Sequence, residues 1–285
     1  MNPSSDKQGQ QQADVTRVTP DGHERLSDVL AVEEPLEIRV VFGPAGKRRS
    51  KSLSITMRTP GSDFELAAGF LLSENIVRSP ADIVKFEHVG PAEEDKDHGN
   101  TLMVELGEAV PFEIERLQRH FYTTSSCGIC GKASLDAVRA QGALPIERTW
   151  KLAQDLVFGL PAVLRKQQGV FEKTGGLHAA GLVDGEGKLL AIREDVGRHN
   201  AVDKLIGSQM MAKAFPLNQR VLIVSGRASF ELVQKAVMAR IPFMVAVGAP
   251  SSLAVDLAQE FDMTLIGFTS SERFNVYAGQ EWLLT

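Results

Sequence analysis

Apolar and polar residues alternate in two segments in the first third of the chain, at 36–40 and 53–57. Because successive side chains of a strand point to opposite faces, this pattern predicts two half-buried strands joined by a glycine-containing turn. Segments 83–89 and 102–106 are further predicted strands, and the charged stretch between them predicts an exposed turn.

A helical pattern separates these two pairs of strands. Ser62 and Glu65 have the spacing of a capping box, in which each side chain bonds a free backbone N–H of the first helical turn. We therefore expect a helix that begins after Ser62 and buries Leu66, Phe70 and Leu71.

The second half of the chain alternates short apolar runs with amphipathic segments. Pro161 is expected to kink or break its helix, and Asn200 to cap the helix that follows it. Alternating strands and helices predict a sheet that is covered on its faces and at least partly parallel. We predict strands at 177–183, 188–192, 221–224, 243–247 and 264–268, and helices at 133–140, 152–167, 201–214, 229–240 and 252–261.

The composition changes near residue 28. Residues 1–28 are rich in Gln, Ser, Asp and Lys and contain few large apolar side chains. Such a segment buries too little apolar surface to offset the entropy lost on ordering, so we predict a disordered tail. The remaining pattern divides the chain into a smaller α+β region at 29–122 and an α/β domain at 123–285.

Charge and cysteine content narrow the class of protein. The net charge of −5 argues against general nucleic-acid binding. No apolar run approaches the roughly 18 residues that cross a bilayer, and no apolar export segment follows the first residues. Without an export signal, the two cysteines predict a cytoplasmic protein whose thiols are reduced and functional.

The two cysteines, Cys127 and Cys130, lie in Ser-Ser-Cys-Gly-Ile-Cys-Gly-Lys. If a helix begins near Lys132, its positive end favours the thiolate, which is the reactive form. The spacing fits a redox pair or half of a zinc site completed by His or Asp. It also fits a persulfide carrier, in which one thiol holds sulfur and the other shields or resolves it. Two incidental thiols are the remaining alternative.

Several segments combine glycines, hydroxyls and basic residues at expected strand ends or helix starts. In open α/β sheets ligands collect at the carboxyl ends of strands, where backbone donors and arginine bind anions. These segments therefore predict a phosphate-bearing ligand. Structural alternatives stay open, because a histidine beside glycines is often structural and Asp195 and Arg198 could pair on the surface. The candidate residues are Gly175, Gly176, His178, Arg193, Arg198, His199, Ser225, Arg227 and Arg273.

Taken in order, these motifs resemble the formate dehydrogenase accessory sulfurtransferase family, FdhD. The resemblance runs from about residue 34 to residue 277 and rests most on Cys-Gly-Ile-Cys-Gly at 127–131 and Arg-Glu-Asp-Val-Gly-Arg-His-Asn at 193–200. Thr-Gly-Gly-Leu-His at 174–178 and Ser-Gly-Arg at 225–227 extend it. The sequence departs from the family where Thr-Ser-Ser follows Phe268, because many members place an arginine there.

The resemblance implies a sulfur carrier with sulfurtransferase activity. A cysteine desulfurase would pass sulfane sulfur to Cys127, with Cys130 beside it, and the protein would sulfurate the molybdenum bis(molybdopterin guanine dinucleotide) cofactor that formate dehydrogenase requires. The implied fold is a cytidine-deaminase-like α-β-α core with a mixed sheet, plus a smaller N-terminal α+β domain, in a homodimer. No nucleic acid, membrane partner or resident metal ion is expected. The family's cofactor-binding stretch maps onto Phe268, Thr269, Ser270, Ser271, Glu272 and Arg273, and GDP is a candidate mimic of the guanine nucleotide.

Two other functions fit parts of the sequence. A zinc nucleobase deaminase needs His-x-Glu followed later by Pro-Cys-x-x-Cys. Here His178-Ala179-Ala180 lacks the glutamate and the cysteine pair comes first, which argues against a deaminase. A non-catalytic chaperone that binds the molybdenum cofactor and docks to formate dehydrogenase stays open, with thiols that serve a zinc or redox role.

Overall fold

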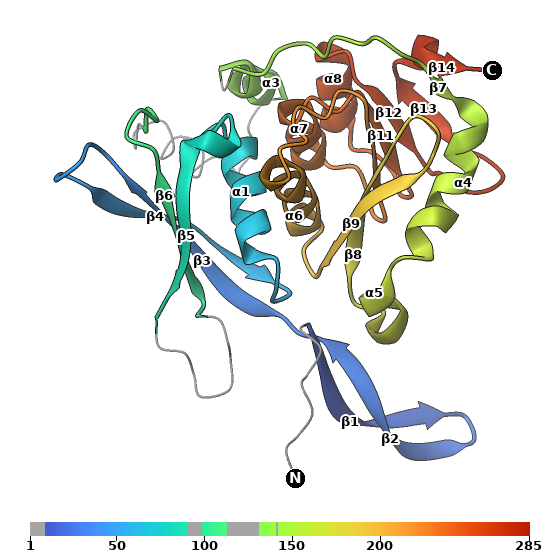
Figure 1. Cartoon of the computed structure of the whole chain (residues 1–285). Helices are drawn as coiled ribbons and strands as arrows, with labels where there is room; N and C mark the ends of the chain where they lie inside the picture. Colours follow the sequence, from blue (N-terminus) through green and yellow to red (C-terminus); the bar gives the residue numbers. More distant parts are fainter. Residues whose placement is uncertain (1–8, 91–98, 113–130, 141) are drawn as a thin grey trace.

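The structure is a computed structural model that describes residues 9–90, 99–112, 131–140 and 142–285. Its elements form layers (Figure 1), with helices on both faces of a large sheet and a further helix between that assembly and a smaller sheet. One face of the large sheet carries α4 (Gln154–Arg165), and the other carries α6 (Arg198–Met211), α7 (Phe230–Met238) and α8 (Ser252–Glu260). Helix α1 (Asp63–Ser73) packs between α6 and the smaller sheet.

The smaller sheet has the strand order β4-β3-β6-β5. Its strands are β3 (Glu34–Phe42), β4 (Arg49–Arg58), β5 (Ile83–Val89) and β6 (Thr101–Leu106), and the 3-10 helix η1 (Pro80–Asp82) precedes β5. The four predicted strands are confirmed. Alternation identified them because residues such as Leu36, Ile38 and Val40 are buried in the same apolar cluster as Leu66 of α1.

Helix α1 is confirmed, but its predicted capping box is wrong. Ser62 has a left-handed backbone with φ of 57°, and its side chain makes no capping hydrogen bond. The Glu65 carboxylate instead accepts a hydrogen bond from Arg193, with Nη2 and Oε1 2.6 Å apart. A partner from a distant strand has therefore replaced the local cap.

The large sheet is mixed, as expected, with the order β13-β12-β11-β10-β8-β9. The three central strands β10, β11 and β12 are parallel to one another, and the other pairs are antiparallel. This confirms an α/β core with a mixed sheet, and its likeness to cytidine deaminases stays a prediction. The strands are β8 (His178–Val183), β9 (Leu189–Asp195), β10 (Val221–Val224), β11 (Phe243–Ala246), β12 (Thr264–Gly267) and β13 (Asn275–Ala278).

The α4 segment differs from its prediction in where the helix begins, and Pro161 does not break it. Leu152–Ala153 forms β7, which pairs with β14 (Leu283–Leu284) near the 3-10 helix η2 (Gln280–Trp282), so the helix begins two residues later than expected. Pro161 lies inside α4, which continues to Arg165, so the helix is not broken there. Val157, Leu160 and Leu164 pack with Val221 and Ile223 of β10, and this burial holds α4 on the sheet. Two short helices complete the described part of this region, α3 (Gly131–Ala140) and α5 (Gly169–Thr174).

Helices α1 and α6 cross at two glycines. A Cβ on Gly69 would overlap the carbonyl oxygen of Asp203, and a Cβ on Gly207 would overlap that of Glu65. The backbones therefore touch directly, which is possible only because neither position carries a side chain. This contact joins the smaller sheet and its helix to the core.

The first strands of the structure correct the prediction of a disordered tail for residues 10–28. They form an antiparallel hairpin, β1 (Gln10–Thr19) and β2 (Gly22–Ala31), that projects from the body of the molecule (Figure 1). Cross-strand pairs such as Val15 with Leu26 supply what little apolar packing the hairpin has. Its base is held by a hydrogen bond of 3.0 Å from the N–H of Val32 to the carbonyl of Gly9.

Membrane association finds no support in the helices. Within the described residues, no helix combines the length and the apolarity that a bilayer crossing requires. The domain limits at residues 28 and 122 stay predictions, and the second of them falls outside the described residues.

Candidate functional site

The carboxyl ends of the three parallel strands meet at one edge of the large sheet. Gly226, Gly248 and Phe268 follow β10, β11 and β12, and their turns continue the pairing of the strands. The N–H of Gly248 donates to Gly226 over 3.0 Å, and the N–H of Phe268 donates to Gly248 over 3.1 Å. We call this row of turns the carboxyl edge, and the helices α7 and α8 begin from it with their N-termini.

His178 joins the carboxyl edge from the antiparallel strand β8. Its neighbour Ala179 donates its N–H to the Ser225 hydroxyl over 2.9 Å. A Cβ placed on Gly226 would lie 3.4 Å from Nδ1 of His178, which is ordinary van der Waals distance, so the imidazole packs beside that turn. The structure thus brings together the predicted residues His178 and Ser225, with Arg227 exposed beside them.

Arg198 and His199 enter the same region from the first turn of α6. The helix begins at Arg198 after an N-cap at Gly197, so Asn200 is not the cap that the sequence suggested. Nε2 of His199 lies 3.3 Å from the Ser229 hydroxyl and 3.8 Å from a carboxylate oxygen of Glu231, both at the start of α7. The nearby imidazole of His199 is the largest cause that lowers the pKa of Glu231 to about 2, against the opposing effect of partial burial. Glu231 is therefore a carboxylate at neutral pH.

Positive charge at the carboxyl edge is not fully neutralised by the protein. Burial is the main cause that lowers the pKa of His178, and the charges of Arg198 and His199 lower it further. The Nε atom of Arg198 is buried and has no hydrogen-bond partner in the described part of the chain. An unpaired buried donor is costly, and the N-termini of α6, α7 and α8 add positive potential, so this edge is suited to an anion.

The segment that follows β12 presents an aromatic ring at this edge. Phe268 is 47% exposed and has a left-handed backbone with φ of 51°, which few non-glycine residues adopt. Thr269 holds the turn, because its hydroxyl donates to the carbonyl of Ala246 over 3.0 Å. Ser270 accepts from the N–H of Arg273 over 3.2 Å and closes a turn, which leaves Arg273 exposed. Of the predicted stretch, Ser271 and Glu272 are exposed on the same turn.

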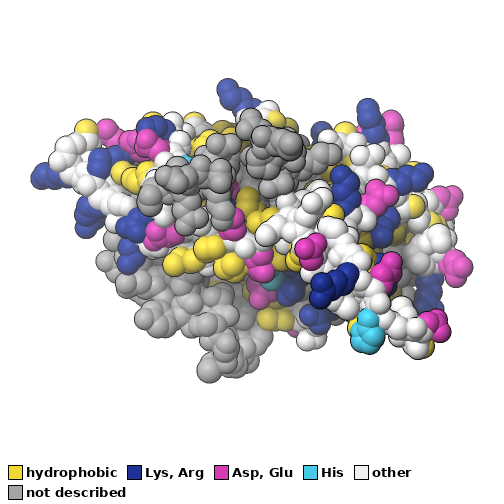
Figure 2. All heavy atoms as spheres, turned by 90° about the horizontal axis from the view of Figure 1, so that it is seen from below, with side chains coloured by type: hydrophobic (Ala, Val, Ile, Leu, Met, Phe, Trp, Pro, Cys, Tyr) yellow, Lys and Arg dark blue, Asp and Glu magenta, His cyan; other side chains and the backbone are white. Residues whose placement is uncertain are grey.

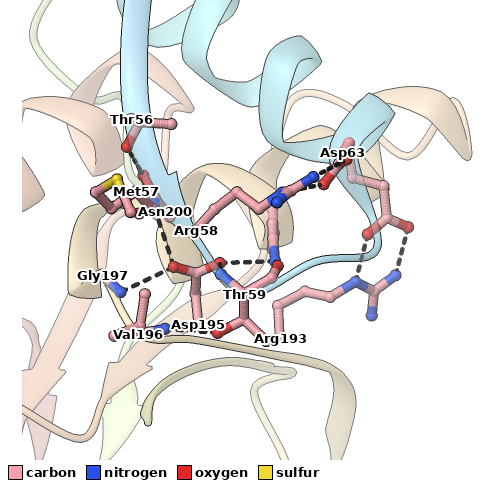
Figure 3. Close-up of polar contacts among 12 residues, drawn as sticks. Thr56, Met57, Arg58, Thr59, Asp63, Arg193, Asp195, Val196, Gly197 and Asn200 are labelled. Carbon is pink, nitrogen blue, oxygen red and sulfur yellow. Dashed lines mark hydrogen bonds and ion pairs between the residues drawn. The ribbon is translucent and has the colours of Figure 1, made fainter. Parts of the chain in front are cut away.

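Three predicted residues, Arg193, Gly175 and Gly176, have other roles in the fold. The Arg193 guanidinium is held by Glu65 of α1 (Figure 3) and also bonds the Ile192 carbonyl, so its prediction as a ligand contact has no support in the geometry. The hydrogen bond to Glu65 raises the pKa of Arg193. Gly175, with φ of 65°, ends α5. A Cβ placed on Gly176 would lie 3.5 Å from the Cβ of Ala31, at the base of the hairpin.

Asp195 is not part of a surface ion pair with Arg198, because it is fully buried. Its carboxylate pairs with Lys204 over 2.7 Å and also accepts from backbone groups on both sides of the junction between α6 and the smaller sheet (Figure 3). Sequence reasoning missed this role. The available signal was the proximity of an acidic residue to a lysine nine positions later in an apolar helix.

The cysteines Cys127 and Cys130 lie outside the described residues. Helix α3 begins directly after them at Gly131, which confirms the predicted helix. Arg139 near the end of α3 bonds Glu260 over 2.8 Å, at the C-terminal end of α8. The carboxyl edge lies at the N-terminal end of α8, so this part of α3 and the edge are at opposite ends of that helix (Figure 1).

The face that contains the carboxyl edge is seen from below in Figure 2. Lys and Arg side chains, carboxylates and apolar side chains lie close together near its middle.

Comparison with known proteins decides the family. The FdhD/NarQ family model matches residues 31–284. The chain belongs to the FdhD/NarQ family. This confirms the resemblance inferred from the motifs.

Members of the FdhD/NarQ family with high identity span nearly the whole chain. The sulfur carrier protein FdhD of Nocardia farcinica is 53% identical and covers 93% of this chain and 91% of the relative. The protein of the same name from Streptomyces coelicolor is 49% identical and covers 94% and 93%. A crystal structure from Desulfotalea psychrophila, described as a candidate formate dehydrogenase accessory protein, has a TM-score of 0.71 at 22% identity and covers 97% of this chain and 100% of that one. This last comparison supports the fold.

Proposed function

We propose that this protein is a sulfur carrier that serves the maturation of formate dehydrogenase. The observation that carries the proposal is the near full-length similarity to proteins named sulfur carrier protein FdhD. The two cysteines are the only residues in the chain that can hold sulfane sulfur, and they lie in one short motif. The donor is a cysteine desulfurase, and the setting is the cytoplasm.

The first chemical step is a transfer of sulfane sulfur without net redox change. The Cys127 thiolate attacks the outer sulfur of the desulfurase persulfide, the S–S bond of the donor breaks, and the desulfurase thiolate leaves. Cys127 then carries the persulfide. The positive end of α3 begins directly after Cys130 and favours thiolate over thiol near this motif.

Release of sulfur needs two electrons, which Cys130 can supply. Its thiolate attacks the inner sulfur of the Cys127 persulfide, a disulfide forms between the two cysteines, and sulfide leaves for the acceptor. A cellular thiol then reduces the disulfide and restores the carrier. This assigns Cys127 as the persulfide site and Cys130 as the resolving residue of a sulfurtransferase.

The substrate that receives the sulfur is proposed to be the molybdenum bis(molybdopterin guanine dinucleotide) cofactor. The carboxyl edge supports this choice, because Arg198, His178 and the helix N-termini can bind phosphate groups and the exposed ring of Phe268 can stack on guanine. GDP is the matching probe. We propose a homodimer as the working state, as the family resemblance implies.

The decisive experiment is an intact mass measurement after incubation with a cysteine desulfurase and free cysteine, without reductant. We expect the gain of a single sulfur atom that cyanide removes, and no gain in the Cys127→Ala variant. Cys130→Ala is the matched control, which should load sulfur but fail to release it. Loading that persists in Cys127→Ala would move the persulfide to Cys130.

A failure to load, with thiols that react with an alkylating reagent, would refute the carrier. It would favour a cofactor-binding chaperone that uses the thiols for zinc or redox chemistry. Zinc content before and after replacement of each cysteine would then distinguish these two uses.

A further inference from the structure

The Asp195 carboxylate is the centre of a buried group of hydrogen bonds. The side chain has no solvent exposure. One oxygen accepts from the N–H of Gly197 over 2.8 Å and from the Asn200 amide over 3.0 Å. The other accepts from the N–H of Thr59 over 3.2 Å and pairs with Lys204 over 2.7 Å. Each oxygen therefore has two donors, which matches the acceptor capacity of an ionised carboxylate.

The same group of contacts joins two regions that are far apart in the chain. The N–H of Val196 donates to the Thr59 hydroxyl over 3.1 Å, and Lys204 donates to the Thr59 carbonyl over 2.7 Å. Asn200 donates to the Met57 carbonyl over 2.8 Å. Figure 3 shows these contacts between the end of β4 and the start of α6. We call this group, residues 56–59 with 195–200 and Lys204, the clasp.

The clasp encloses the segment that carries Arg198 and His199. Asp195 binds the residue before Arg198 and the residue after His199, so both sides of this pair are fixed to one carboxylate. A helix N-terminus held in this way cannot shift without breaking buried, charge-assisted hydrogen bonds. The position of Arg198 and His199 relative to α7 therefore depends on Asp195, which is itself fully buried.

We propose that Asp195 is a positioning residue that holds Arg198 and His199 in the geometry required for phosphate binding at the carboxyl edge. This rests on the proposed nucleotide function of that edge. Preorganised donors bind an anion more tightly than mobile ones, because the entropy of ordering them is lost at folding and not at binding. Within the clasp, Lys204 neutralises the charge of the Asp195 carboxylate.

A second buried ion pair provides a matched control on the same helix. Asp203 pairs with Lys235 over 2.7 Å and accepts from the Ser73 hydroxyl over 3.1 Å. It is also buried, at 3% exposure, and it joins α6 to α7. It makes no hydrogen bond to the first turn of α6 among the described residues. Asp203→Asn is thus the same chemical change as Asp195→Asn, at a site that only stabilises the fold.

The test measures both variants in the full-length chain by calorimetric titration with GDP and by hydrogen exchange of a peptide that spans 196–203. We expect Asp195→Asn to weaken GDP binding by about tenfold, the loss of a well-placed charge-assisted contact, and to speed exchange at 196–200. Asp203→Asn should lower the melting temperature to a similar extent and leave GDP affinity and exchange at 196–200 unchanged. If Asp195→Asn does not fold, the double variant Asp195→Asn with Lys204→Met, which leaves no unpaired buried charge, is measured by the same criteria.

Equal GDP affinity in the two variants would overturn the proposal, because Asp195 would then only stabilise the fold. A wild-type chain that does not bind GDP would remove the nucleotide site itself. The exchange measurement still decides the role of Asp195 in that case, since unchanged exchange at 196–200 would show that it does not hold the turn.

Discussion

The crossing of α1 and α6 leads to a sharp prediction about stability. In Gly207→Ala, the new Cβ would lie 2.7 Å from the backbone nitrogen of Gly69 and would overlap the carbonyl oxygen of Glu65, whereas real Cβ contacts essentially never fall under 3.0 Å. Both colliding atoms belong to the backbone of a helix, so no side-chain rotation relieves the contact. The two helices must move apart.

The size of the effect follows from two opposing terms. Overpacking of a close-packed interior costs about 1–3 kcal/mol, and the upper end applies because the colliding atoms are backbone. Replacing glycine by alanine inside a helix gains about 1 kcal/mol. The difference is a net loss of about 2 kcal/mol, which corresponds to a fall in melting temperature of about 4–8 °C at about 2–4 °C for each kcal/mol.

Gly159→Ala is the matched control. Gly159 lies inside α4, and nothing lies within 4 Å of a Cβ placed there. Only the gain of about 1 kcal/mol remains, so this variant should melt about 2–4 °C above the wild type. Thermal unfolding followed by circular dichroism compares all three chains. A Gly207→Ala variant that melts at or above the wild type would refute the direct backbone contact between α1 and α6.

Three further predictions concern the carboxyl edge. Arg198→Met should weaken GDP binding by about tenfold in calorimetry. Arg193→Met should lower the melting temperature and leave GDP affinity unchanged, because Glu65 of α1 holds the Arg193 guanidinium. Equal losses of affinity in the two variants would show that Arg193 contacts the ligand as well. Burial, followed by the nearby Arg198 and His199, lowers the pKa of His178, and a bound phosphate favours its charged form, so GDP affinity should rise as pH falls towards that lowered pKa. The proton taken up on binding should make the observed binding enthalpy depend on the ionisation heat of the buffer, and a pH-independent affinity would exclude His178 from the phosphate contact. Because the pKa of Glu231 is lowered in the folded chain, its carboxylate stabilises the fold at pH values above its ordinary pKa of 4.5. This contribution is lost as the pH falls towards about 2. The urea midpoints of the wild type and Glu231→Gln should therefore differ most near neutral pH and converge in acid, and a gap that widens in acid would contradict this sign.

Most elements of the fold could be predicted because their burial follows the period of strands or helices. Strands such as 221–224 and 243–246 are fully buried, so each appears as a short apolar run between helices. The hairpin at 10–31 could not be found in this way, because most of its side chains are exposed on both faces. Its order depends on cross-strand pairing and on contacts at its base, neither of which leaves an apolar pattern in the sequence.

The candidate site was predictable in part for a related reason. The rule that ligands collect at the carboxyl ends of parallel strands located Ser225, Arg227 and Phe268 at one edge. Two pairings were not predictable, Glu65 with Arg193 and Asp195 with Thr59, since the partners lie more than a hundred residues apart along the chain. The capping pattern indicated Ser62 as the partner of Glu65, and the nearby opposite charge indicated Arg198 as the partner of Asp195. In the folded chain Glu65 binds Arg193 and Asp195 pairs with Lys204 instead.

The string from Arg193 to Asn200 shows how one motif can serve both the fold and a site. Arg193 and Asp195 are two positions apart on β9, so they share a face, and that face meets α1. Asn200 turns back to the same junction from inside α6, and only Arg198 and His199 are left for the carboxyl edge. Substitutions at 193 and 200 should thus appear first as lost stability, and substitutions at 198 and 199 as lost binding. Asp195 is the exception if the clasp positions Arg198 and His199, because a buried residue that touches no ligand would then control affinity.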